Sequence, residues 1–576
     1  MKNRKFNSLL TKLISSIILL ALTTVSLAFV TVGPTNDCDY NNLEAAYNDN
    51  DATMRVTSQS TYSEVFIIEK TKFIFGGYDT CADAENNTLG TSKSKWRLGV
   101  NIEANLPALS IIFLDHFEIY DGSNNSFAGA GGIRVAGNSS LLLSNSNVHD
   151  NQSIEGGGIR VSGSAAKVTI TNTTIENNTA SENGAGVYCS DEAFFTMIGE
   201  SAIENNSATF NGGGIYATDD CQISVLSGNT PNELTRYGIL TNTAVRGGGV
   251  FMRNGADMEL TGNDEHPATI LGNASTLNDD FDVTVLLGGG GVYLTGDGTT
   301  FVGTNARIDS NIAKFHGAGF AVEYNAEFTM QRKDTPCWSN DKCSTLYRNN
   351  ISENNGSGAV GYLFDHGTAH IYNTYISENK ADVSSLFVAY VSSFLYLEGN
   401  LIVNNTSTNQ ASASHLIEMK RANLQSQVNF HYNTLTANNA WSIFHIDNTL
   451  GKQQLFTYNS IIWEQGDIIE QVGGSSNIVR FVCNLVHETT SLSVASILQY
   501  TYIINPNFVD AINFDYQLAN NSQAKDMCQD TSVASGNDLN GNYRGYDDVN
   551  LDDLQGPFDA GAYEQNLDLI FANGFE

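Results

Sequence analysis

A repeated pair of small residues at the start of apolar, strand-like segments constrains the fold of this chain more than any other feature. Each pair is two glycines, or an alanine and a glycine, and is followed by Ile, Val or Phe. Successive pairs are 26, 28, 28, 35, 42 and 28 residues apart. A period of about 27 residues with occasional insertions predicts an array of stacked repeats. The pairs begin at Gly131, Gly157, Ala185, Gly213, Gly248, Gly290 and Ala318.

A second motif keeps the same period and consists of an aliphatic residue, two further residues and an asparagine. In four repeats without insertions, the asparagine lies 18 or 19 residues after the first apolar residue of the strand-like segment. Because stacked repeats place equivalent residues above one another, we expect these asparagines to form a ladder of amide hydrogen bonds. The ten positions are Asn151, Asn178, Asn206, Asn242, Asn273, Asn311, Asn354, Asn379, Asn405 and Asn438.

The composition of the repeats decides which kind of array forms. They are rich in Thr, Val, Ile, Asn and Gly, and segments such as Lys167–Thr171 alternate between polar and apolar residues. Alternation is typical of half-buried strands, whereas a helical repeat would need good helix formers. We therefore predict an all-β fold, a right-handed parallel β-helix with three short strands per coil. It would have roughly a dozen coils and extend about 60 Å. The small-residue pairs suit tight turns with unusual backbone angles.

Both ends of such a stack expose strand edges and need covers. Residues Leu43–Tyr47 suit a short N-terminal capping helix, and the irregular acidic sequence after residue 505 predicts a C-terminal cap. We divide the chain into a signal peptide (1–28), an N-terminal cap with the first coils (29–125), the β-helix repeats (126–504), the final coils and C-terminal cap (505–564) and a tail (565–576).

The first 28 residues have the pattern of a secretory signal peptide. Four basic residues precede the apolar run Leu13–Leu22, and Ser26 and Ala28 are small residues suited to a cleavage site. The alternative is an uncleaved membrane anchor. No later segment reaches the roughly 18 apolar residues of a spanning helix, so we expect no integral membrane domain after cleavage. The expected location is extracellular or at the cell surface, in a bacterial envelope.

The eight cysteines all follow this segment. An even number of cysteines in an exported chain favours disulfides. Cys337 and Cys343 flank a short loop and form the expected local pair, and the other pairs are neighbours in sequence. They are Cys38 with Cys81, Cys189 with Cys221, and Cys483 with Cys528. The Cys-x-x-Cys spacing of structural zinc sites is absent from the sequence.

The formal net charge of −33 excludes some classes of partner. Nucleic acid and anionic membrane surfaces are disfavoured because their binding depends on neutralising phosphates with basic residues. Sugars, cations and basic protein surfaces remain compatible with this charge.

One group of carboxylates is the candidate for catalysis or for binding calcium. Asp191 and Glu192 follow one strand-like segment by the same number of residues as Asp219 and Asp220 follow the next. If the coils are in register, the four carboxylates lie on adjacent coils, and such crowding raises a pKa or attracts Ca²⁺. Arg253, on the following coil, would be the basic neighbour. The alternative is an ordinary solvated turn.

A second calcium candidate lies near the C-terminus. Asp548, Asn550 and Asp552 match the first half of a calcium-binding loop, although the sixth position is Asp553 instead of Gly. Calcium is the one cofactor that the sequence suggests.

The two repeated motifs resemble the Gly-Gly-Ala-Ile and Phe-x-x-Asn repeats of polymorphic outer-membrane proteins. Segment 43–78 resembles the first turns of pectin-lyase-like right-handed β-helix proteins, and 505–526, Arg544 and 559–564 resemble their closing pattern. The resemblance implies the β-helix fold and covers nearly all of 38–564. Only 71 residues follow Asn505, too few for the membrane barrel that ends autotransporters.

These observations leave two functional hypotheses. The first is a non-catalytic exported protein with an adhesive, recognition or structural role that binds a glycan or a cell-surface protein. The long inserts 228–239, 254–268, 273–287 and 331–349 would then carry binding. The second is a lyase or hydrolase that acts on an acidic polysaccharide through the carboxylates at 191, 192, 219 and 220. Fold alone does not separate them.

Overall fold

The structure is a computed structural model of the 576-residue chain. It describes residues 28–564 except for 52, 105–108, 125, 127–128, 228–236, 263–266, 277–287, 333–345, 349, 354–355, 382–385, 408–413, 421–424, 450, 474–476, 530–536 and 546–553. Residues 1–27 of the predicted signal peptide (1–28) and the tail 565–576 lie outside the described residues, as does the pair Cys337 and Cys343.

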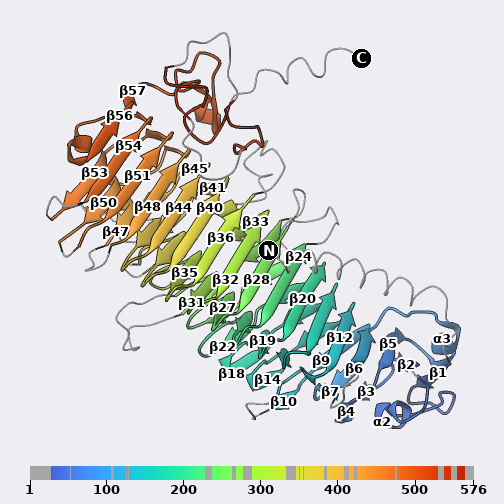
Figure 1. The fold of residues 1–576 in the computed structure, drawn as a ribbon. Coiled ribbons are helices and arrows are strands. Elements are labelled where there is room, and N and C mark those ends of the chain that lie inside the picture. The colour runs from blue at the N-terminus through green and yellow to red at the C-terminus, as the bar shows by residue number, and fades with distance from the viewer. Residues whose placement is uncertain are drawn as a thin grey trace, which may run out of the picture.

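The described chain winds into an elongated parallel β-helix (Figure 1). Its strands form a 17-stranded sheet A, a 16-stranded sheet B, a 14-stranded sheet C and a 10-stranded sheet D of short strands. Every pairing within these four sheets is parallel. In one coil, β12 (Ser139–Ser144) lies in sheet A, β13 (Asn147–His149) in sheet B, β14 (Gln152–Glu155) in sheet D and β15 (Ile159–Ser162) in sheet C.

The all-β prediction is therefore confirmed, with two differences. The coils number more than a dozen, and many have a fourth short strand, because sheet D pairs the segments after the ladder asparagines. These strands are mostly two residues long, as in β22 (Ser207–Ala208), which is too short to produce an alternating pattern in the sequence.

Strand register places aliphatic residues above one another inside the coils. In sheet C, Ile159 of β15 pairs with Val187 of β19 (Val187–Ser190), which pairs with Ile215 of β23 (Ile215–Ala217). All three side chains are fully buried in one continuous apolar cluster that runs from Val30 to Leu492. Burial of apolar area along this axis is the main source of stability.

The small-residue pairs are required by close coil-to-coil contact and not by backbone angles. A Cβ atom on Gly158 would lie 2.6 Å from the backbone O of Gly186, and one on Gly186 would lie 2.5 Å from the O of Gly214. The left-handed conformation instead occurs one position before six of the seven pairs, as at Gly184 with φ of 65°. The expectation of unusual angles within the pairs is thus wrong.

The asparagine ladder is continuous along one edge of the β-helix. Asn178, for example, donates from its backbone N and from Nδ2 to Asn206 Oδ1, both at 3.0 Å, and Nδ2 also donates to the Val148 carbonyl. The same pattern joins Asn151, Asn178, Asn206, Asn242, Asn273, Asn311, Asn350, Asn379, Asn405 and Asn438.

One predicted ladder position is wrong. Asn350 occupies the place between Asn311 and Asn379, and Asn354 lies outside the described residues. The strand β37 (Leu346–Arg348) places Tyr347 opposite Ile308 and Ile376, so the motif at this coil begins with an aromatic residue three positions before Asn350. The predicted motif begins with an aliphatic residue, so the prediction placed it at Ile351 and its asparagine at Asn354.

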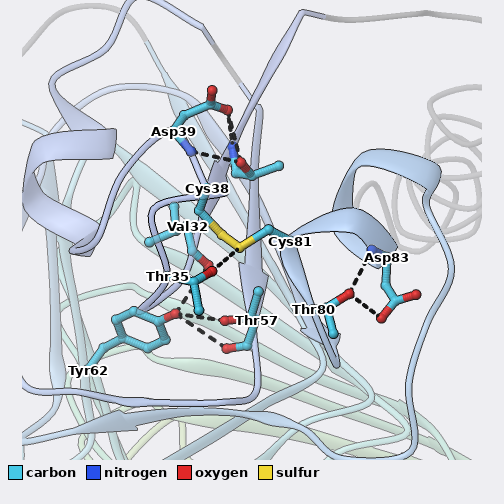
Figure 2. The surroundings of a disulfide bond; sticks show 10 residues. Val32, Thr35, Cys38, Asp39, Thr57, Tyr62, Thr80, Cys81 and Asp83 are labelled. Atoms are coloured by element: carbon cyan, nitrogen blue, oxygen red, sulfur yellow. Dashed lines mark hydrogen bonds between the residues drawn. A yellow bond between two sulfur atoms is a disulfide. The ribbon is translucent and has the colours of Figure 1, made fainter.

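The N-terminal cap contains the predicted helix α2 (Leu43–Tyr47) and a second helix, α3 (Cys81–Asn86). The disulfide Cys38–Cys81, with Cα atoms 5.2 Å apart, joins the loop after β1 (Phe29–Val32) to the start of α3 (Figure 2). Thr80 caps α3 by accepting a hydrogen bond from the backbone N of Asp83. The cap is thereby fixed to the first coils at several points.

The C-terminal cap lies beside the last coils and includes the antiparallel pair β58 (Phe508–Asp510) and β59 (Asp515–Leu518). The disulfide Cys483–Cys528 connects it to the β-helix. Arg544 donates to the carbonyls of Gly561 and Ala562, so two parts of the C-terminal pattern, Arg544 and residues 559–564, are in contact. The Arg544 guanidinium also lies over the Tyr432 ring of the β-helix. Within the described residues, no helix is long and apolar enough to cross a membrane.

Candidate functional site

The four carboxylates singled out in the sequence lie on turns of adjacent coils. Asp191 and Glu192 directly follow β19, and Asp219 and Asp220 follow β23 after a single intervening residue. All four are exposed and have positive φ angles of 53° to 61°. Glu192 N donates to the Asp219 carbonyl at 2.8 Å, so the two turns are stacked as predicted.

Stacking of these turns does not make their carboxylates converge. Asp191 accepts from the Ser190 hydroxyl, and Asp219 accepts from Asn254 Nδ2 at 3.1 Å. Arg253 is exposed; its Nε lies 3.4 Å from Thr218 Oγ1, and its guanidinium lies 5.7 Å from the centre of the Tyr216 ring. Calcium binding or catalysis at these turns remains a prediction. The other calcium candidates, Asp548, Asn550 and Asp552, lie outside the described residues.

A column of aromatic rings runs along the outer side of sheet C. Tyr188, Tyr216, Phe251 and Tyr293 occupy equivalent positions on successive coils, with neighbouring ring centres 5.0 to 5.4 Å apart and the planes within 18° of parallel. The rings are buried and stack face to face along the β-helix axis. Tyr216 and Phe251 contact a ring on both faces, and the Arg160 guanidinium lies 4.3 Å from the centre of the Tyr188 ring, so this column serves packing.

The same column changes chemistry toward the C-terminus. Strand register continues it through Val388, Glu418, His445 and Glu470, on β43 (Phe387–Ala389), β47 (His415–Met419), β50 (Ser442–Asp447) and β53 (Asp467–Val472). Lys420 Nζ lies 3.9 Å from Glu418 Oε2. The two coils beyond Glu418 thus place an imidazole and a carboxylate where earlier coils place aromatic rings.

His415 completes a cluster with His445 and Glu470. Its ring stacks on that of His445 with centres 4.1 Å apart, and the two Nδ1 atoms lie 3.4 and 3.6 Å from the same Glu470 oxygen, Oε2. Among the described residues, no other group of three His, Cys, Asp or Glu side chains has its ligating atoms within 4.8 Å of one another. Burial lowers the pKa of His415 to about 3, and the neighbouring His445 acts in the same direction, so this imidazole is neutral at physiological pH.

The outer face of sheet A carries half-buried rings on three of four consecutive coils, and we call this group the ring face. It consists of His370 and Tyr372 on β40 (Thr368–Tyr372), Phe394 and Tyr396 on β44 (Phe394–Glu398), and Phe456 and Tyr458 on β51 (Gln454–Tyr458). The intervening residues of these strands point into the core and are buried. Between β44 and β51, the strand β48 (Gln427–His431) presents amide groups, among them Asn429.

A buried titratable pair borders the ring face where the C-terminal cap meets sheet A. Glu398 is opposite His431 on the next coil, and both are buried. Burial raises the pKa of Glu398 to about 7, against the opposing effect of Arg544, and burial lowers the pKa of His431 to about 4. Glu398 Oε1 and His431 Nε2 have no hydrogen-bond partner. His431 is therefore neutral near neutral pH, whereas Glu398 changes between its protonated and ionised forms there.

Sequence reasoning missed the histidine cluster and the ring face. The signal for the aromatic column was present, because each of its rings follows the first core residue of a glycine-preceded strand. The cluster left no such signal, since His415, His445 and Glu470 lie 30 and 25 residues apart, in coils where the repeat motifs are degraded.

Comparison with known proteins supports the fold and little beyond it. Residues 110–264 match a family model described as right handed beta helix region. Together with the long parallel sheets, this match identifies the fold as a right-handed parallel β-helix. No curated protein and no solved structure gives a significant match to the chain. Three disulfides in the described chain, Cys38–Cys81, Cys189–Cys221 and Cys483–Cys528, pair as predicted and are compatible with export.

Proposed function

We propose that this chain is an exported, non-catalytic recognition protein that binds an extended glycan along the ring face. The observation that carries the proposal is the set of half-buried rings that β40, β44 and β51 place in register on one parallel sheet. His370 stacks on Tyr396 with ring centres 4.6 Å apart, which fixes both side chains before a ligand arrives. Preorganised rings lower the entropic cost of binding.

The ring face is suited to a polysaccharide, which is a polar polymer whose sugar rings have apolar faces. Aromatic rings provide contact area for the carbon–hydrogen faces of a sugar, and neighbouring amides and hydroxyls provide hydrogen bonds. Gln427 and Asn429 lie between the rings of β44 and β51, and the Tyr372 hydroxyl lies 2.9 Å from His370 Nδ1. Neighbouring coils about 4.8 Å apart present ring and amide side chains along the β-helix axis. A polymer lying along this axis would therefore meet similar groups at each step.

Binding of the purified protein to an immobilised panel of polysaccharides, with variants of the central column of sheet A, tests the proposal. Tyr396→Ala and Phe456→Ala are expected to weaken binding at least tenfold. Thr196→Ala and Ser224→Ala are the matched controls, because both residues are half-buried in the same column on distant coils and the variants are expected to bind normally. Equal binding by all four variants would reject the ring face as the ligand site.

The competing hypothesis, a lyase or hydrolase, is tested on the same panel by assaying reducing ends and unsaturated uronides. We expect neither product. Should either appear, Asp219→Ala and Glu398→Gln locate the chemistry, since only the first removes a carboxylate of the exposed turns. If activity were lost in either variant but kept in Tyr396→Ala, the enzyme hypothesis would replace the recognition hypothesis.

A further inference from the structure

We propose that His415, His445 and Glu470 form a binding site for a divalent transition-metal ion, Zn²⁺ by its geometry, that clamps three successive coils together. The site is independent of the ring face, because it lies on sheet C and the ring face lies on sheet A. Its three residues come from β47, β50 and β53. Two imidazoles and one carboxylate are a ligand set that zinc and related metals accept.

The distances fit a tetrahedral metal better than direct hydrogen bonds. His415 Nδ1 and His445 Nδ1 lie 3.4 and 3.6 Å from Glu470 Oε2, longer than a charge-assisted hydrogen bond of about 2.8 Å. A regular tetrahedron with metal–ligand bonds of about 2.1 Å separates its ligand atoms by about 3.4 Å. A regular octahedron with the same bonds would separate adjacent ligands by only about 3.0 Å. The two separations to Glu470 Oε2 are thus close to the tetrahedral value, and all three ligand atoms lie within 4.8 Å of one another.

Two of the ligating atoms lack any other partner. His445 Nδ1 and Glu470 Oε2 are buried and form no hydrogen bond, which is costly unless a further group joins them. His415 Nδ1 also lies 2.7 Å from Ser442 Oγ, so that hydroxyl must rotate when the nitrogen binds a metal. The loss is one hydrogen bond, which is small beside the free energy of a metal bond.

The surroundings are suited to holding an ion and to admitting it. Beneath the cluster, Leu416, Phe444 and Ile469 are buried in the core, so the cluster has an apolar floor. The side chains of His415, His445 and Glu470 are 5%, 13% and 28% exposed. Glu470 is the most exposed of the three side chains, so we expect an ion to enter past it.

Zinc uptake by the full mature chain, stripped of metal with a chelator and dialysed, tests the site. We expect one equivalent of Zn²⁺ per chain by competition with a chromophoric chelator, and a rise in Tm on addition of zinc. Co²⁺ at the same site should give the intense visible absorption of a tetrahedral ion. A weak, six-coordinate spectrum would overturn the assigned geometry.

Variants separate this site from adventitious binding. Glu470→Gln and His445→Gln should weaken zinc binding at least tenfold and abolish the rise in Tm. His149→Gln is the control, since His149 also lies beside a carboxylate, Asp150, at 2.8 Å on a distant coil, and should behave as wild type. Glu470 is partly exposed, so Glu470→Gln keeps the test valid if His445→Gln does not fold. Unchanged affinity in Glu470→Gln, or no stoichiometric uptake by the wild type, would overturn the proposal.

Discussion

At the residue scale, the asparagine ladder shows how one side chain serves two coils. Asn178, for example, accepts from Asn151 on the coil before it, and its Nδ2 donates both to Asn206 on the coil after it and to the Val148 carbonyl on the coil before it. Every described residue that directly precedes a ladder asparagine is in the left-handed conformation, as at Asn205 with φ of 54°, which turns the chain so that the amide points inward. A buried amide with all of its hydrogen bonds satisfied stabilises the turn, and an incomplete one destabilises it.

Replacing one ladder asparagine should therefore be costly. Asn206→Ala removes donors to Ile175 O and Asn242 Oδ1 and the acceptor for Asn178. We expect a loss of about 3 kcal/mol in the free energy of unfolding, because several buried groups lose their partners together. Chemical denaturation measures the change. Ser207→Ala, one residue away and exposed, should change stability by less than about 0.5 kcal/mol; equal losses in the two variants would contradict a special role for the ladder.

At the element scale, the ladder ends on a carboxylate. Asn438 donates from its backbone N at 2.6 Å and from Nδ2 at 2.7 Å to Glu464 Oε1. Burial raises the pKa of Glu464 to about 7, although the hydrogen bonds from Asn438 oppose this. A glutamine at position 464 could accept the same two hydrogen bonds without titrating. Because the residue there is a glutamate, the stability of the last coils should depend on pH.

The sign of this sensitivity follows from the raised pKa. Between the ordinary glutamate value of about 4.5 and about 7, the folded chain holds a proton that the unfolded chain releases. Stability should therefore fall as pH rises through this window. Glu464→Gln should remove that contribution and be more stable than wild type at pH 8 by on the order of 1–3 kcal/mol. The advantage should vanish near pH 4, as thermal unfolding at both pH values would show.

A matched substitution separates this effect from the general effect of removing a negative charge. Glu259 is exposed on the outer face of sheet A, and Glu259→Gln should show no such pH-dependent gain. If both variants gained stability equally at pH 8, relief of the net charge of −33 would explain the result instead.

At the scale of the whole molecule, the β-helix is a stack whose two ends are closed differently. Helices α2 and α3 and the disulfide Cys38–Cys81 close the N-terminal end. The C-terminal cap instead lies along the side of the last coils, where Ala562 N donates to Thr434 Oγ1 and Gly561 N donates to the Asn459 carbonyl. A repeat array unfolds most readily from its ends, so these contacts control the resistance of the chain to proteolysis.

Removal of the disulfide Cys483–Cys528 should release the cap while leaving the coils folded. In the double variant Cys483→Ala with Cys528→Ala, we expect limited proteolysis to cut within 505–564 several times faster, with an unchanged far-ultraviolet circular dichroism spectrum. The corresponding double variant of Cys189 and Cys221, which joins two adjacent coils in the core, should leave cleavage of the cap at the wild-type rate. Faster cleavage of the cap in both variants would argue for general loosening.

The sequence by itself determined the parallel β-helix, its repeat period and nine of the ten predicted ladder positions, because each coil obeys the same local rule. Apolar residues, glycines and asparagines at a fixed offset must stack when coils are in register. The ring face and the cluster of His415, His445 and Glu470 were decided only by the tertiary structure. Their residues share no motif, and inserts of unequal length separate them, so only the winding of the coils places them side by side.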